Sequence, residues 1–216
     1  MNASFWEARR CLREPIPEIA EARALLDHAA NAHLSGDRIA AHSLIRAADL
    51  PAVRAWTESI WGKHNNDILR ERLVPNAPPR LNVVDRPKPR MPIAAVRRKA
   101  RERDGYHCRF CGIAVIDKSI RTLLSAAYPE ALAWGRRNAD QHAAFQCMWL
   151  QYDHLMPNGR GGDSSLDNVV VTCAPCNFGR MERTLAEVGV LPPAAPTASA
   201  WDGLMRLVTP AQRLPI

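Results

Sequence analysis

The sequence has no long apolar run and no apolar leader segment. Of its 216 residues 47% are hydrophobic, yet no stretch approaches the roughly 20 consecutive apolar residues that a membrane-spanning helix needs. The first residues, MNASFWEARRCLREP, are charged where a secretory signal peptide is apolar. We therefore expect a folded cytoplasmic protein without a membrane span, long enough for one ordinary domain and a smaller one.

Cysteine is scarce, and four of the six cysteines fall in two C-x-x-C pairs. A reducing compartment disfavours disulfides, so the pairs indicate metal ligands. Four thiolates in this arrangement predict a closed, tetrahedral structural zinc (Zn²⁺) site: Cys108, Cys111, Cys173 and Cys176. Four reduced core cysteines are the alternative, and no spacing requires His107 or His142 as ligands. Cys11 and Cys147 are expected to be buried or free thiols.

Acidic residues are rare between positions 86 and 109. Nine basic side chains and two acidic ones lie there, so this stretch accounts for the whole net charge of +7. Positive charge beside a metal site is typical of a surface that binds phosphate groups. We expect nucleic-acid contacts from four of its side chains: Arg97, Arg98, Lys99 and Arg101. A solvated basic linker is the alternative.

Apolar spacing and proline content divide the chain into segments. The predicted division is a helical N-terminal domain (1–73), a proline-rich linker (74–92), a domain that holds the site (93–189) and a C-terminal tail (190–216). A helical insertion is predicted at about 117–146, interrupted at Pro129. We expect the insertion to pack against the sheet. DNA contact through Arg136 and Arg137 is the alternative.

The segment MWLQYDHLMPNGRGGDSSLDNVVVTCAPCNFGRMERT divides into strand, loop, strand and helix. Runs of β-branched and aromatic residues at 148–155 and 169–172 predict the strands, and NGRGGD between them predicts a flexible connection. The helix is expected from Ala174 to near Gly189, a natural left-handed cap. The fold class is therefore α+β, a mainly helical chain with a small zinc-braced ββα core.

The order of these residues is similar to the HNH endonuclease family, over roughly residues 95 to 188. The matching features are Asp-His at the end of one strand, a Gly-Gly loop, an asparagine opening the next strand, and C-x-x-C-N leading a helix. The resemblance implies a ββα-metal nuclease core in which His154 is the general base and Asp153 a metal ligand. It also implies that Asn168 braces the loop and that Asn177 is the second metal ligand.

The chemistry of these residue types agrees with that implication. Histidine has the unperturbed pKa needed to activate water, and a cation polarises the scissile phosphate. Because Asn177 offers an amide oxygen, we expect Mg²⁺ or Mn²⁺ there rather than Zn²⁺ or Ni²⁺. Arg180, which matches a basic position of the family, and Arg160 are expected to contact nucleic acid.

The sequence thus predicts a metal-dependent endonuclease that hydrolyses phosphodiester bonds in DNA, which we expect to be double-stranded. The alternative is a non-catalytic, zinc-stabilised nucleic-acid-binding module. The N-terminal helices contain no chemical signature. We expect them to bind a protein partner or a second copy of the chain.

Overall fold

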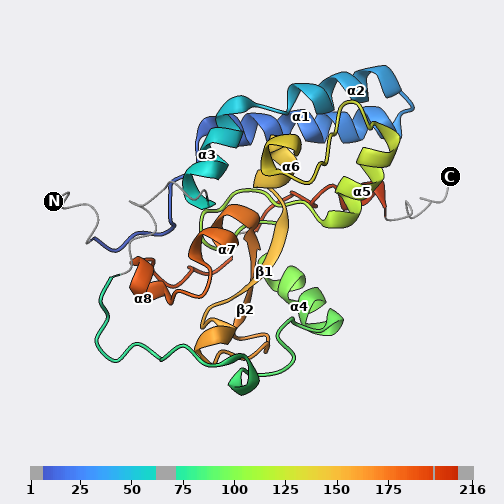
Figure 1. Ribbon diagram of the computed structural model, residues 1–216. Coiled ribbons are helices and arrows are strands. Elements are labelled where there is room, and N and C mark those ends of the chain that lie inside the picture. Colours follow the sequence, from blue (N-terminus) through green and yellow to red (C-terminus); the bar gives the residue numbers. More distant parts are fainter. Residues whose placement is uncertain (1–6, 62–71, 197, 209–216) are drawn as a thin grey trace.

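Helices dominate the part of the protein that the structure describes, and the one small sheet there is antiparallel (Figure 1). The structure is a computed structural model, which describes residues 7–61, 72–196 and 198–208. The helices in these ranges are α1 (Pro17–Leu34), α2 (Arg38–Ala47), α3 (Pro51–Trp61), α4 (Ala94–Asp104), α5 (Lys118–Ala127), α6 (Ala143–Cys147), α7 (Ala174–Arg180) and α8 (Leu185–Val188). The strands are β1 (Leu150–His154) and β2 (Val169–Cys173). This composition agrees with the α+β class.

Helices α1, α2 and α3 form a layer at the top of Figure 1. Local signals set their ends. Asp37 caps α2 by accepting a hydrogen bond from the Ala40 amide, and Pro51, whose missing N–H does no harm in a first turn, begins α3. Leu26 of α1 and Ile45 of α2 are fully buried. No helix in the described ranges is both long and apolar enough to cross a membrane.

The β1–β2 hairpin lies between two helices. Its register pairs Leu150 with Cys173 at one end and His154 with Val169 at the other. Neighbouring residues of a strand point to opposite faces. Tyr152 contacts α4 and Asp153 contacts α7, so these helices cover opposite faces of the hairpin.

The helix expected from Ala174 to near Gly189 is two helices in the structure, so that prediction is wrong in its extent. The chain leaves α7 at Met181, whose φ of 55° is left-handed and ends the helix. A capping box on Thr184 then starts α8, and Gly189 closes it with a φ of 63°. This break could not be predicted from the sequence, because methionine does not favour a positive φ.

The proline-rich segment from 74 to 92 runs around the lower edge of the molecule to α4 (Figure 1). It contacts the loop that joins the two strands. The Leu81 amide donates to the Gly159 carbonyl, and the Asn158 side chain donates to the Pro87 carbonyl, both at 2.8 Å. The segment therefore borders the strand-joining loop, and the division into domains stays a prediction.

The insertion packs into the core. Ile120, Leu124 and Leu132 are at most 1% exposed, and α6 contacts α3. Helix α5 ends at Ala127, just before the predicted interruption at Pro129. The C-terminal segment also packs, because Trp201 is buried and its indole N–H donates to the Val115 carbonyl at 3.1 Å.

Candidate functional site

Four cysteines converge at the end of the hairpin where β1 begins and β2 ends. Cys108 and Cys111 lie in a tight knuckle in which the Gly112 amide bonds to the Cys108 carbonyl, and Gly112 has a φ of 77° that suits glycine. Cys173 ends β2 and Cys176 lies in the first turns of α7. The four sulfur atoms all lie within 4.8 Å of one another.

This cluster fits a metal ion. Zinc–thiolate bonds of about 2.3 Å place tetrahedral sulfur atoms about 3.8 Å apart, and the Sγ atoms of Cys111 and Cys173 are 3.7 Å apart. Burial opposes ionisation of Cys108, but the mutual contacts of the thiols outweigh it and lower its pKa. The contacts and burial raise the pKa of Cys111, Cys173 and Cys176, as expected when one thiolate is shared among four close sulfur atoms. The four cysteines are thus positioned to bind a metal ion and are compatible with structural zinc.

The remaining cysteines and the two candidate histidines lie outside the cluster. Burial raises the pKa of Cys11 to about 12 and also raises the pKa of Cys147, as expected for inert core thiols. His142 hydrogen-bonds to the Ile45 carbonyl at 2.8 Å. Within the described ranges, no second group of three or more His, Cys, Asp or Glu side chains lies at metal-binding distance.

Side chains on one face of β1 contact α7 at three successive positions. Alternation along the strand puts Trp149, Gln151 and Asp153 on this face. The side-chain pairs are Trp149 with Phe178, Gln151 with Asn177, and Asp153 with Arg180. The Asn177 amide lies 3.5 Å from the Gln151 oxygen, so Asn177 is one step along the strand from Asp153.

Arg180 binds the carboxylate of Asp153. Its Nη2 and Nε atoms lie 2.6 and 3.1 Å from Oδ2, while the backbone amide of His154 donates to Oδ1 at 2.8 Å. Arg180 is 2% exposed and also donates to the carbonyls of His154, Leu155 and Arg183. Burial raises the pKa of Asp153 and outweighs the lowering by Arg180. Arg180 therefore holds the Asp153–His154 end of β1 from inside the protein.

His154 has one ring nitrogen engaged. Its Nε2 lies 2.9 Å from the Ser164 hydroxyl oxygen, and that hydroxyl is 2.8 Å from the Pro89 carbonyl and 3.0 Å from the Arg90 carbonyl. Carbonyls only accept, so the single proton of the hydroxyl is directed to these carbonyls and Nε2 donates to the hydroxyl oxygen. This network favours the tautomer in which Nδ1 is unprotonated. Burial also lowers the pKa of His154, which keeps the imidazole neutral at pH 7.

Asn168 spans the loop between the strands. Its side-chain oxygen accepts from the Met156 amide at 2.8 Å, and its side-chain nitrogen donates to the carbonyls of Met156 and Asp163 at 3.0 and 2.7 Å. Gly162 lies so close to this contact that a Cβ there would be 1.8 Å from the Met156 carbonyl oxygen. Asn168 thus braces the loop that follows His154.

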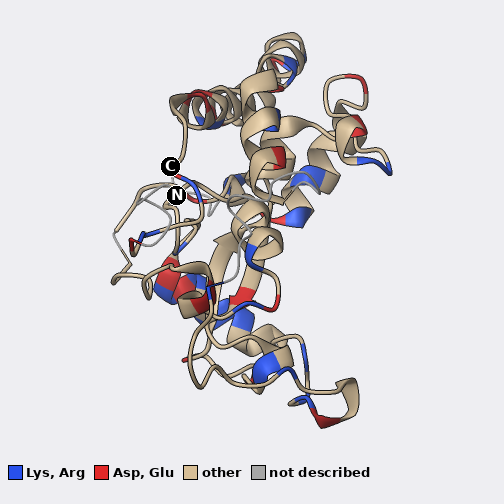
Figure 2. Ribbon diagram, turned by 60° about the vertical axis from the view of Figure 1, so that its left-hand side comes forward, with Lys and Arg blue, Asp and Glu red and all other residues tan. Residues whose placement is uncertain are grey.

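The predicted nucleic-acid contacts divide into two groups. Arg97, Arg98 and Lys99 are exposed on α4. The excess charge there contrasts with the rest of the ribbon in Figure 2, where basic and acidic residues are interspersed. Arg98 lies 3.6 Å from Glu102 in an exposed i,i+4 ion pair, and all three side chains are open to solvent.

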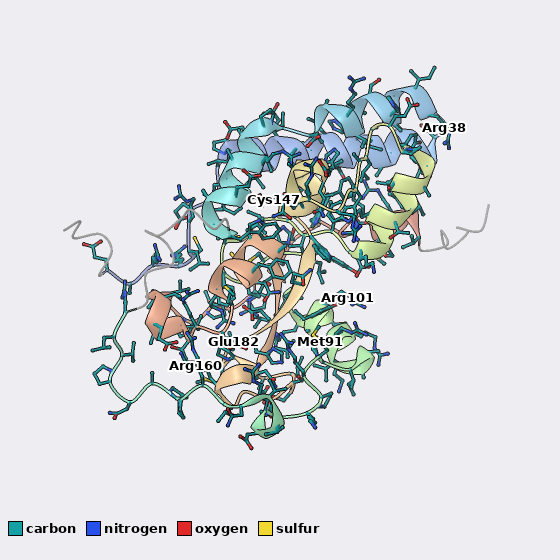
Figure 3. The ribbon with its side chains drawn as sticks, in the orientation of Figure 1. Arg38, Met91, Arg101, Cys147, Arg160 and Glu182 are labelled. Carbon is teal, nitrogen blue, oxygen red and sulfur yellow. The ribbon has the colours of Figure 1, made fainter. Side chains whose placement is uncertain are left out.

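The other three predicted contacts are arginines that bind the protein itself. Arg101 donates to the Tyr152 hydroxyl, and Arg180 pairs with Asp153. Arg160 lies beside Glu182 (Figure 3), whose carbonyl it approaches at 3.3 Å, and pairs with Glu187 at 2.6 Å. Their positions brace the loop and strands.

Ser164 was missed by sequence reasoning. It is ten residues from His154, in a loop, and no local pattern distinguishes it from Ser165. The one sequence feature that pointed to Ser164 was that its hydroxyl lies in the loop that contains the Gly-Gly pair. Its contact with His154 depends on how the loop folds back against the proline-rich segment.

Comparison with known proteins gives no family. No protein-family model matches the chain. Neither a curated protein nor a solved structure matches it.

Proposed function

We propose that this protein is an HNH-type endonuclease that hydrolyses phosphodiester bonds in DNA. The observation that carries the proposal is the arrangement of His154, whose Nε2 is held by Ser164 so that Nδ1 is left to accept a proton. This imidazole follows Asp153 at the end of β1, and Asn168 braces the loop beyond it. The order and placement of these residues support the resemblance.

In the proposed reaction the chain supplies a base. The neutral imidazole of His154 takes a proton from water at Nδ1, and the resulting hydroxide attacks phosphorus while the P–O ester bond breaks and the departing oxygen takes a proton from solvent water. The Nε2–H bond to Ser164 keeps the ring from rotating. The exposed cations of α4, including Arg97 and Lys99, would contact the phosphodiester backbone.

The resemblance further implies Mg²⁺ or Mn²⁺ at Asp153 and Asn177. As these residues lie, they do not form a cation site, because Arg180 binds Oδ2 of Asp153 and Asn177 is turned to Gln151. A cation would have to compete with Arg180 for the same carboxylate oxygen. Metal dependence is therefore tested separately from the role of His154.

The test is conversion of supercoiled plasmid to nicked and linear forms. His154→Ala should lower the rate roughly 10²- to 10⁴-fold, the range of general-base catalysis, with DNA binding and zinc content unchanged. The matched control is His28→Ala, an exposed histidine on α1. Full activity in His154→Ala would refute the mechanism. Cleavage with Ni²⁺ or Zn²⁺ equal to that with Mg²⁺ would refute the metal preference.

The second candidate is a zinc-stabilised nucleic-acid-binding module without catalysis. The buried Arg180–Asp153 pair favours it, since the carboxylate already has a cationic partner. This candidate predicts DNA binding without nicking, whether Mg²⁺ is present or absent. Binding by the N-terminal helices to a partner, or to a second copy, is proposed under either function.

A further inference from the structure

Four aromatic side chains form a continuous row; they come from the end of α3, the segment between α5 and α6, the residue before β1, and α7. We call Trp61, Trp134, Trp149 and Phe178 the aromatic row. The ring centroids are 6.0 Å apart for Trp134 and Trp149, 6.1 Å for Trp149 and Phe178, and 5.3 Å for Phe178 and Trp61. All three pairs are tilted or edge-to-face, with interplanar angles of 59° to 90°, so the rings are not stacked on one another.

The aromatic row is partly exposed to solvent. Phe178 is 41% exposed, and the three tryptophans are partly exposed. Large apolar side chains that remain open next to polar groups are typical of binding surfaces. The polar Gln151–Asn177 pair lies directly beside Trp149 and Phe178 on the same face of the hairpin.

Arg121 lies against the row without an acidic partner. It is 8% exposed, and its Cζ atom is 3.7 Å from the Trp134 ring centroid and 4.9 Å from that of Trp149. Its Nη1 atom is buried without a hydrogen-bond partner, and no ion pair to Arg121 occurs in the described part of the chain. The guanidinium therefore has an unused donor at Nη1, which an anionic or carbonyl-bearing ligand that reached it would satisfy.

The row is close to the proposed reaction centre. Trp149 precedes Asp153 by four residues on the same strand face, a separation of roughly 13 Å at strand rise. By alternation His154, the next residue, points to the other face, so a strand with a phosphate at His154 would pass around the edge of the hairpin to place a base against Trp149 or Phe178.

We propose that the aromatic row binds the unpaired nucleobases of a single nucleic-acid strand, with Arg121 donating to a phosphate or base carbonyl. The inference rests on the proposed function and specifies its substrate as nucleic acid with unpaired bases near the cut. Stacking on aromatic faces needs bases that are free of a duplex, and a cation held against the rings complements the charged backbone. A purely apolar protein partner would leave Arg121 unsatisfied.

Binding is measured with full-length protein carrying His154→Ala, so that cleavage does not interfere. An oligothymidine of about 12 nucleotides, within the site sizes of single-strand binders, should quench tryptophan fluorescence. Phe178→Ala should weaken its binding roughly 5- to 100-fold. The matched control is Ile39→Ala, which removes an exposed apolar side chain from α2 and should leave binding unchanged.

Three further measurements separate stacking from charge. An abasic strand of the same length keeps the phosphates but lacks bases, so it should bind weakly and cause no quench, and a blunt duplex should compete poorly. Trp134→Phe keeps a ring and should retain binding with a smaller quench. Equal binding of abasic and intact strands, preference for the duplex, or full binding by Phe178→Ala would overturn the inference.

The result is independent of catalysis. Single-strand binding without any nicking by the wild-type protein would refute the nuclease and keep the aromatic row as a binding site. Nicking of plasmid with no quench by the oligonucleotide would keep the nuclease and refute this inference.

Discussion

Asp104 and Asp153 are both buried aspartates that contact arginine, one at each side of the hairpin. Asp104 is 3% exposed and lies at the end of α4. Its carboxylate accepts hydrogen bonds from the Arg103 side chain at 2.7 Å, from the Arg109 side chain, and from the Val171 amide at 2.9 Å. Burial opposes ionisation there, but these donors together hold the pKa of Asp104 below its usual value.

Asp153 has fewer donors. It is 5% exposed and receives Arg180 and the amide of His154, and burial raises its pKa despite them. The difference indicates that the Asp104 carboxylate stabilises the contact between α4 and β2. The ionised carboxylate of Asp153, in contrast, lowers the stability of the folded protein. Ionisable groups whose pKa is shifted by burial beside a specific partner are frequent in functional sites.

The largest expected effect comes from the cluster that joins both sides. Cys108 follows α4 and Cys176 belongs to α7, so a metal ion would connect the two faces of the hairpin. Cys108→Ser or Cys176→Ser should remove cooperative thermal melting and the bound zinc, because structural zinc contributes about 10–16 kcal/mol in small domains. Cys11→Ser, outside the cluster, should keep both. Unchanged melting of either cluster variant would contradict this.

Loss of the Asp104 carboxylate is expected to have the next largest effect. Asp104→Ala leaves two arginines and the Val171 amide without their acceptor, so unfolding free energy should fall by about 3–5 kcal/mol. Urea denaturation measures this change. The exposed Glu130→Ala serves as control. A smaller loss of unfolding free energy in Asp104→Ala than in Asp153→Asn would contradict the comparison between the two aspartates.

Asp153→Asn should have a smaller effect. The amide oxygen still accepts from Arg180, but the buried guanidinium loses its anionic partner and the new NH2 group faces the His154 amide, so unfolding free energy should fall by about 2–3 kcal/mol. If Asp153 displaces Arg180 to bind the cation that the resemblance implies, plasmid nicking should nevertheless be strongly impaired. Comparing urea denaturation with the nicking rate separates the two roles of this residue.

The smallest expected effect is on the pH dependence of stability. Because the pKa of Asp104 is lower in the folded protein than in the unfolded chain, its stabilisation is present above the unfolded value of about 3.9 and is lost as pH falls through the folded value. The wild-type protein should lose at most about 1.4 kcal/mol per pH unit to this group. Asp104→Asn should show a shallower loss between pH 5 and 3, as measured by urea denaturation at each pH. An identical slope would argue against the shift.

Much of the fold follows from short-range features. The cap at Asp37, the prolines that begin α1 and α3, and the apolar runs of the strands act over a few residues, so their elements could be predicted. The break at Met181 could not, because Arg180 turns into the core to reach Asp153, a residue 27 positions away.

The sequence by itself determined the four-cysteine cluster, because C-x-x-C spacing presents two sulfur ligands from one turn and only one further contact, between the pairs, had to form. Tertiary structure decided which side chains meet at Asp153 and His154. Arg180, rather than Asn177, contacts the carboxylate, and Ser164 holds the imidazole. These partners depend on how α7 crosses β1 and how the loop meets the proline-rich segment, and such packing is set by contacts across the whole chain.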